Sequence, residues 1–383
     1  MAQRHPDPTG SPDQVPAGFP AVPPLPAPPG RGDARERASA PTGEAVAVYL
    51  RAQATEFLRA LRLHRETGGA AAAGAAEPAD AARALRRSAR RISAGLHTFR
   101  ALLDTEWSDE MRPELAWVSG TLGLEHAYEA RLERLLLALH RLSGTSALPG
   151  RAVTAAGPLT AATVPAPGTG LPAPERGPLT VGAAKAGALL DRRLTLARTR
   201  AHSTALQALG SSRFHAVADR VAVLASEVPL APAAPAADPR PPAAAAEERL
   251  THAVAALPLV TAGHPYNAEA LVHGLSPEPS PHPQDGPWHQ VRLLLRLHRY
   301  AQEVLDGGGP PADTRLRAAG HALNRHRDAS EAASAAAQAA RTPRIAPATA
   351  YALGVLHADQ RHEVEAARFA FQRAWQKQTV GAP

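Results

Sequence analysis

Apolar residues recur at spacings of three, four and seven along most of the chain, as they do in amphipathic α-helices. The first such stretch begins near Glu44 and continues through Val46, Leu50, Phe57 and Leu61. Residues at these spacings share one face of a helix, so they predict a stripe that packs against a core. No stretch alternates apolar and polar residues for long enough to build a sheet. The pattern therefore predicts an all-α protein.

The same periodicity predicts further helices along the chain. After a short Gly/Ala linker at about 68–78, the first of them covers about 79–103. The next two carry separate leucine-rich stripes and would complete a four-helix unit. One of these stripes contains Leu115, Val118 and Leu122, and the other contains Leu132, Leu135, Leu136 and Leu139. The remaining predicted helices cover about 181–210, 213–228, 288–305, 314–340 and 347–378.

Segments rich in Pro, Gly and Ala separate these helices. Residues 1–42 form a segment of this kind, which cannot bury enough apolar surface to offset the entropy lost on ordering, so we expect a disordered tail. A similar linker at 144–178 divides the helices into two groups, at about 43–143 and about 179–378. Short connections favour antiparallel neighbours. We therefore expect two antiparallel helical bundles with Pro/Ala-rich linkers, and the likeness of ARALRRSARRI to HQVRLLLRLHRY suggests a duplication.

Composition narrows the possible functions. The chain has no Cys, which excludes disulfides, thiolate metal sites and cysteine nucleophiles. No stretch reaches the roughly 18 apolar residues of a membrane span, and the first residues lack the apolar region of a signal peptide. We expect a cytoplasmic protein with no membrane partner. The net charge is +7, and almost all basic residues are Arg, so their positions decide what the charge is for.

Arginines on the predicted helix at 79–103 form a row along one face. Arg83, Arg86 and Arg90 are spaced three and four apart, with Arg87 and Arg91 beside them. Like charges at this spacing repel each other, so the row favours a bound anion or an acidic partner.

The predicted helix at 288–305 repeats the arrangement. His289, Arg292, Arg296 and Arg299 share one face, and leucines occupy the opposite one. The planar guanidinium matches pairs of phosphate oxygens, and a ladder with a pitch of about 5.4 Å follows a linear polyanion without reading a sequence. The alternative is that these arginines are solvated or pair with Asp and Glu between helices.

Three motifs make the chain similar to the CHAD family, the conserved histidine alpha-helical domain. ARALRRSARRIS at 82–93 resembles the first family signature, V-H-x-x-R-V-x-x-R-R-L-R, with Arg83 in place of the namesake His. WHQVRLLLRLHRY at 288–300 resembles the second, L-H-x-x-R-K-x-x-K-R-x-R-Y, with Leu293 and Leu297 at usual basic positions. LNRHRD at 323–328 resembles a later L-G-x-x-x-D pattern.

The resemblance implies two four-helix bundles around a basic cavity and inorganic polyphosphate as ligand. We predict a non-catalytic binding module without a cofactor. The predicted polyanion-binding residues are Arg83, Arg86, Arg90, Arg91, His289, Arg292, Arg296, Arg299 and His326.

An enzyme that hydrolyses triphosphates is one alternative function. CHAD domains often accompany triphosphate tunnel enzymes, which carry an E-x-E-x-K strand signature. This chain offers only Glu363-Val364-Glu365 in a helical context, and it has no P-loop or G-x-S-x-G elbow. Thus no catalytic residue is assigned.

A metal site would need ligands such as His289, His326 and Asp328, or His357 with His362. The last pair is spaced i, i+5, which suits one helix face poorly, and we assign no metal. Nucleic acid remains an alternative because its backbone carries similar charge, although few aromatics offer base stacking. A helical scaffold with a vestigial cavity also remains open.

Overall fold

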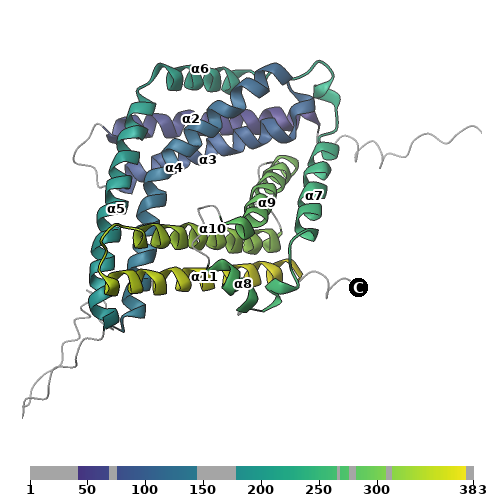
Figure 1. The fold of residues 1–383 in the computed structure, drawn as a ribbon. Coiled ribbons are helices and arrows are strands. Elements are labelled where there is room, and N and C mark those ends of the chain that lie inside the picture. The colour runs from purple at the N-terminus through teal and green to yellow at the C-terminus, as the bar shows by residue number, and fades with distance from the viewer. Residues whose placement is uncertain are drawn as a thin grey trace, which may run out of the picture. The chain divides into compact units, whose positions relative to one another are not determined.

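The structure is a computed structural model, and it describes residues 42–68, 76–144, 178–264, 268–275, 282–307 and 313–376. These residues form helices joined by short connections (Figure 1). The all-α class is confirmed for them. The predicted tail at 1–42 and the linker at 144–178 lie outside the described residues, apart from their last or first positions.

The first helices of the chain pack against one another. They are α2 (Gly43–Gly68), α3 (Ala76–Thr98), the short 3-10 helix η1 (Arg100–Leu102) and α4 (Thr105–Leu142). Asp104 caps the start of α4, because its side chain accepts a hydrogen bond from the backbone N–H of Trp107.

The prediction of two helices between residues 104 and 143 was wrong, since α4 is a single helix of 38 residues. Its two leucine stripes looked separate because they face different surroundings. Leu115 and Leu122 join a core with α2 and α3, whereas Leu135 and Leu139 join another with α10 and α11. A change of buried face along one helix resembles a break when only the spacing is visible.

The rest of the described chain is also helical. The elements are α5 (Pro178–Leu209), α6 (Ser212–Ser226), α7 (Arg240–Ala255), α8 (Ala268–Gly274), α9 (Gly286–Leu305), α10 (Thr314–Ala340) and α11 (Pro347–Gln376), with short 3-10 helices between some of them. The sequence did not predict α7 or the short α8. The start of α7 falls within the Pro/Ala-rich stretch 229–245, whose composition predicts a linker. The two prolines of α7 occupy its first turn, where Pro is tolerated.

Three clusters of buried apolar side chains hold the helices together. The first contains Phe57, Leu85 and Phe214 from α2, α3 and α6, and the second joins α4, α5, α10 and α11. The third surrounds Trp288 and Phe371 and joins α7, α9, α10 and α11. In Figure 1, α4 and α5 run from the layer of α2, α3 and α6 to that of α10 and α11. Each of the first two clusters contains residues that precede and residues that follow the segment 144–178 in the sequence. The division into two bundles at this segment therefore stays a prediction.

Candidate functional site

Four arginines from α3 and α9 line one cavity of about 470 Å³, which we call the first cavity. Arg86 and Arg90 come from α3, and Arg292 and Arg296 come from α9. The middle of α4 forms a third wall, and Arg327 of α10 completes the lining. Residues that are about 200 positions apart in the sequence therefore meet in one basic space.

The packing of α3 explains why Arg86 and Arg90 reach this cavity. Leu85, Ala89 and Ile92 are fully buried in the first core, and the two arginines, each one position further along, lie at the edge of this buried face. Their Nε atoms both donate to α4. Arg86 Nε reaches the carbonyl oxygen of Ser119 at 3.1 Å, and Arg90 Nε reaches its Oγ at 3.0 Å.

Gly123 on α4 leaves the space in which the Arg86 guanidinium lies. A Cβ atom at this position would stand 2.4 Å from Cζ of Arg86. Such a contact is far below van der Waals distance, so any side chain here would force Arg86 to move. A glycine in a helix interior costs about 1 kcal/mol relative to Ala, and here it allows a guanidinium to lie against the helix backbone.

The arginines of α9 are held in a similar way by apolar packing on the opposite face. Val291 and Leu295 are buried in the third core, which leaves Arg292 and Arg296 half-buried at its edge. Nε of Arg292 is buried and has no hydrogen-bond partner within the described structure. Arg299 continues the row, but it does not line the first cavity.

Four of the arginines that line the first cavity have no carboxylate partner among the described residues, unlike Arg112 and Arg327. Within the described part of the chain, Arg86, Arg90, Arg292 and Arg296 form no ion pair with a carboxylate. Burial, followed by the charge of neighbouring arginines, lowers the pKa of Arg90 to about 9 and that of Arg292 to about 10. The pKa values of Arg86 and Arg296 are also lowered, chiefly by burial. All four stay protonated at neutral pH, so the cavity holds unpaired positive charge.

The two other predicted site residues of α3 lie outside the first cavity. Arg83 is exposed and pairs with Asp80 at 2.6 Å. Arg91 makes a two-pronged ion pair with the buried Glu303, with its Nε 2.8 Å from Oε2 and its Nη2 3.1 Å from Oε1. Burial alone lowers the pKa of Arg91, but the hydrogen bond and charge of Glu303 outweigh it and leave the pKa raised. For Arg91, the alternative given in the sequence analysis therefore holds, because it pairs with a carboxylate of another helix.

His326 is also placed outside the cavity, in the interior, with only 1% of its surface exposed. Its ring stacks on Trp288 at a centroid distance of 5.7 Å and meets His289 edge to face at 5.4 Å. His289 is half-buried and lines neither the first cavity nor its neighbour described below. The predicted role of His326 in binding therefore has no support from its position.

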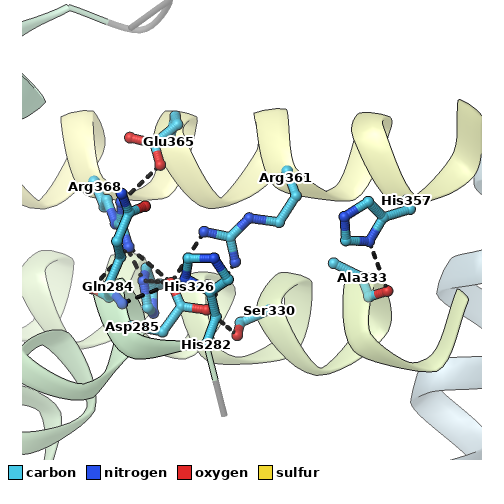
Figure 2. Close-up of polar contacts among 10 residues, drawn as sticks. All are labelled: His282, Gln284, Asp285, His326, Ser330, Ala333, His357, Arg361, Glu365 and Arg368. Carbon is cyan, nitrogen blue, oxygen red and sulfur yellow. Dashed lines mark hydrogen bonds and ion pairs between the residues drawn. The ribbon is translucent and has the colours of Figure 1, made fainter. Parts of the chain in front are cut away.

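The surroundings of His326 form a buried charged network, drawn in Figure 2. At its centre, the Asp285 carboxylate accepts hydrogen bonds from Arg361 Nη1 at 2.8 Å and Arg368 Nη2 at 2.7 Å. Arg368 also pairs with Glu365 at 2.7 Å. Two guanidiniums and two carboxylates balance, so the charge network is neutral when His326 is neutral.

This network determines the protonation of His326. Its Nε2 lies 3.5 Å from Asp285 Oδ1 and accepts a hydrogen bond from Arg368 Nε at 3.4 Å. Burial lowers the pKa of His326 to about 4, and the positive charge of Arg368 lowers it too, although Asp285 opposes both. A proton on His326 would add a third buried cation, which the network does not compensate.

A second cavity, of about 280 Å³, adjoins the first and shares Arg86 and Arg327 with it. Its walls add His126, Arg131 and Arg134 of α4, and it also contains Asp328 and Glu331 of α10.

Some residues of these cavities were missed from the sequence. Arg327 lies in the LNRHRD stretch, but nothing there indicates which side of α10 meets α9. Ser119 carries no recognisable signal, because an isolated Ser within a helix is usually unremarkable. Among the described residues, no three His, Asp or Glu side chains cluster so as to hold a metal ion. None of the helices described is both long and apolar enough to span a bilayer.

The first prediction compares two arginines that have opposite surroundings. Arg296→Met should raise the free energy of unfolding of the ligand-free protein by up to about 1 kcal/mol, because it removes a half-buried unpaired charge. Arg91→Met should lower it by about 3–5 kcal/mol, because it leaves Glu303 buried without its cation. Urea unfolding followed by circular dichroism measures both. Equal destabilisation by the two substitutions would contradict this description of the cavity.

The second prediction concerns the pH dependence of stability. The pKa of His326 in the folded state, about 4, lies below its ordinary value. The folded protein then binds fewer protons than the unfolded chain between about pH 6.5 and pH 4. The free energy of unfolding should therefore fall as the pH is lowered through this range, with roughly 2–3 kcal/mol of the loss due to His326.

In His326→Gln, the free energy of unfolding should fall by roughly 2–3 kcal/mol less than in the wild type over this pH range. His215→Gln, at an exposed position, should behave like the wild type. The two variants and the wild type are compared by urea unfolding at several pH values. A wild-type slope that persists in full in His326→Gln would show that His326 does not titrate in this way.

The chain is similar to one family model and to solved structures. The model of the CHAD domain matches residues 52–337. The solved structure of PptA from Streptomyces chartreusis is 69% identical in sequence, and the match covers 88% of this chain and 100% of that chain with a TM-score of 0.71. The CHAD domain from the plant Ricinus communis is 16% identical, over 86% of this chain and 92% of that chain, with a TM-score of 0.46. A search of curated proteins gives no match. Since the family model covers about three quarters of the sequence, the chain belongs to the CHAD domain family.

Proposed function

We propose that the protein binds inorganic polyphosphate, or a closely similar linear polyanion, in the first cavity and catalyses no reaction on it. The observation that carries this proposal is the set of four half-buried arginines without a carboxylate partner in the described structure. Holding like charges together in a partly desolvated space is unfavourable in the free protein. An anion bound there removes the repulsion and supplies the missing acceptors.

The chemistry of the arginines favours phosphate. Each guanidinium presents several donors in a fixed plane, and Arg86 and Arg90 use only Nε in the hydrogen bonds to Ser119. No other residue of the described ranges accepts from their remaining N–H groups, which can therefore meet phosphate oxygens in pairs. Membership of the CHAD family supports the same ligand class, since the resemblance of the three motifs already implied it.

The cavity fits nucleic acid less well. Its lining contains arginine, small and aliphatic residues, and among the described lining residues His97 is the only one with an aromatic ring. Binding of single strands usually relies on aromatic side chains on which bases stack. A volume of about 470 Å³ is also typical of small-ligand sites, and it cannot admit a duplex.

The third prediction tests the proposal directly. Combined substitution of Arg86, Arg90, Arg292 and Arg296 by Ala should abolish binding of polyphosphate at low salt, measured by isothermal titration calorimetry. Wild-type affinity should fall steeply as salt rises, because counterions released from the polyanion drive binding. Circular dichroism should show that the variant keeps its helical signal.

A matched variant separates specific contacts from net charge. Arg59, Arg62, Arg83 and Arg87 are exposed on α2 and α3 outside both cavities, and their replacement by Ala removes the same total charge. This variant should keep most of the affinity. Equal loss in the two quadruple variants would refute a specific cavity, and unaltered binding by the first would show that the ligand binds elsewhere on the protein. Absence of binding by the wild type would support a scaffold with a vestigial site.

The fourth prediction uses the close approach of Gly123 to Arg86. Gly123→Ala should displace the Arg86 guanidinium and lower polyphosphate affinity about tenfold, the loss expected for one charged hydrogen-bonding group. Stability should not fall, because Ala is the better helix former by about 1 kcal/mol. Gly354→Ala on α11 is the control, since no atom would crowd its Cβ. A tenfold loss in the control as well would show that binding is sensitive to helix rigidity and not to Arg86.

A further inference from the structure

The two cavities lie in succession along α4. The first cavity uses the α4 residues between Arg112 and Gly120, and the second uses those between His126 and Arg134. At a rise of about 1.5 Å per residue, Arg112 and Arg134 are about 33 Å apart along the helix. Arg86 and Arg327 belong to both linings, so the second cavity continues the first along α4.

The second cavity differs from the first in containing its own carboxylates. Glu331 pairs with Arg131 at 2.5 Å and lies 3.8 Å from Nε of Arg327. Asp328 also pairs with Arg327, accepting from its Nε at 2.9 Å. The side chains of Glu331 and Asp328 are 38% and 45% exposed. These carboxylates pair with the arginines to which an incoming anion would bind. Their side chains are exposed enough to rotate into solvent.

Two cations of the second cavity, Arg131 and Arg134, have contacts besides these carboxylates. Arg131 lies over the ring of Tyr128, with Cζ 5.4 Å from its centroid. Arg134 donates from Nε to Oε1 of Gln360 at 2.7 Å. These two guanidiniums keep those contacts if Glu331 moves away, and Arg327 keeps its pair with Asp328.

We propose that the second cavity is a subsite for the continuation of a polyphosphate chain, and that Glu331 closes it to short anions by occupying Arg131 and Arg327. This inference rests on the proposed function of the first cavity. A short anion that fills the first cavity does not reach beyond Arg86 and Arg327. A longer chain held there brings further phosphates to the second cavity at high effective concentration, where they displace the carboxylate. The pair of cavities thus selects for chain length.

The experiment compares two ligands on the full chain by isothermal titration calorimetry at low salt. Tripolyphosphate probes the first cavity alone, and long-chain polyphosphate probes both. Glu331→Gln should raise affinity for the long chain about fivefold, the effect expected from losing one competing partly exposed ion pair. It should change tripolyphosphate affinity by less than about twofold. In the Glu331→Gln background, Arg131→Ala should remove the gain for the long chain and leave tripolyphosphate binding unaltered.

Glu114→Gln is the control for net charge. Glu114 lies on the same helix as Arg131 but pairs with Arg213 and lines neither cavity. It should alter both affinities by less than about twofold. The inference is overturned if Glu331→Gln leaves long-chain affinity unchanged, or if it raises the two affinities equally. Those results would leave the proposed function intact, provided that the wild type still binds both ligands. Failure of the wild type and of Glu331→Gln to bind either ligand would overturn the proposed function and this inference together.

Discussion

The Asp285 carboxylate holds together the part of the structure on which the cavity arginines of α9 depend. It lies directly before the first residue of α9 and accepts hydrogen bonds from Arg361 and Arg368 of α11. It also accepts a hydrogen bond from the Ser330 hydroxyl of α10. Because these contacts are buried, the loss of one partner would leave an uncompensated charge. The resulting loss of stability is far larger than that from breaking a surface ion pair. The start of α9, and with it the positions of Arg292 and Arg296, is therefore held against α10 and α11.

The arginines of this protein fall into two groups with opposite energetics. Arg91, Arg361 and Arg368 each meet a buried carboxylate and compensate its charge. Four arginines of the first cavity meet hydroxyl or carbonyl oxygens, or no partner among the described residues: Arg86, Arg90, Arg292 and Arg296. Holding these half-buried charges without a carboxylate is unfavourable in the free protein. The packing of apolar residues on the opposite faces of α3 and α9 must offset it. Sites that bind charged ligands commonly sacrifice stability in this manner.

The sequence predicted the fold class, and four of its predicted site residues line the first cavity. Helical spacing placed Arg86, Arg90, Arg292 and Arg296 on two faces, and the structure brings these faces together. It could not separate Arg90 from Arg91, since adjacent residues on one helix differ only by a rotation of about 100° about the axis. Arg91 turns instead to Glu303, 212 positions away.

The spacing of residues also could not predict which helix each side of α10 contacts. His326 and Arg327 are neighbours in the sequence, but one stacks on Trp288 in the interior and the other lines both cavities. The pattern of apolar residues on α10 defines its buried face but not the helix that each side contacts. Long-range partners such as Ser119 and Asp285 depend on that packing, which a single sequence does not specify.

The hydrogen bonds from Arg86 and Arg90 to Ser119 show how a helix can orient cations without neutralising them. A carboxylate at residue 119 would hold both guanidiniums more strongly, but it would also cancel the charge that attracts an anion. A carbonyl and a hydroxyl oxygen each occupy one Nε–H and leave the other donors of the guanidinium available. Gly123 allows Arg86 to adopt this position without a neighbouring side chain. In the second cavity, carboxylates pair with the arginines directly. The two cavities therefore differ in their acceptors. In the first cavity, hydroxyl and carbonyl oxygens leave the arginines open to an anion. In the second cavity, an anion must displace a carboxylate before it can bind.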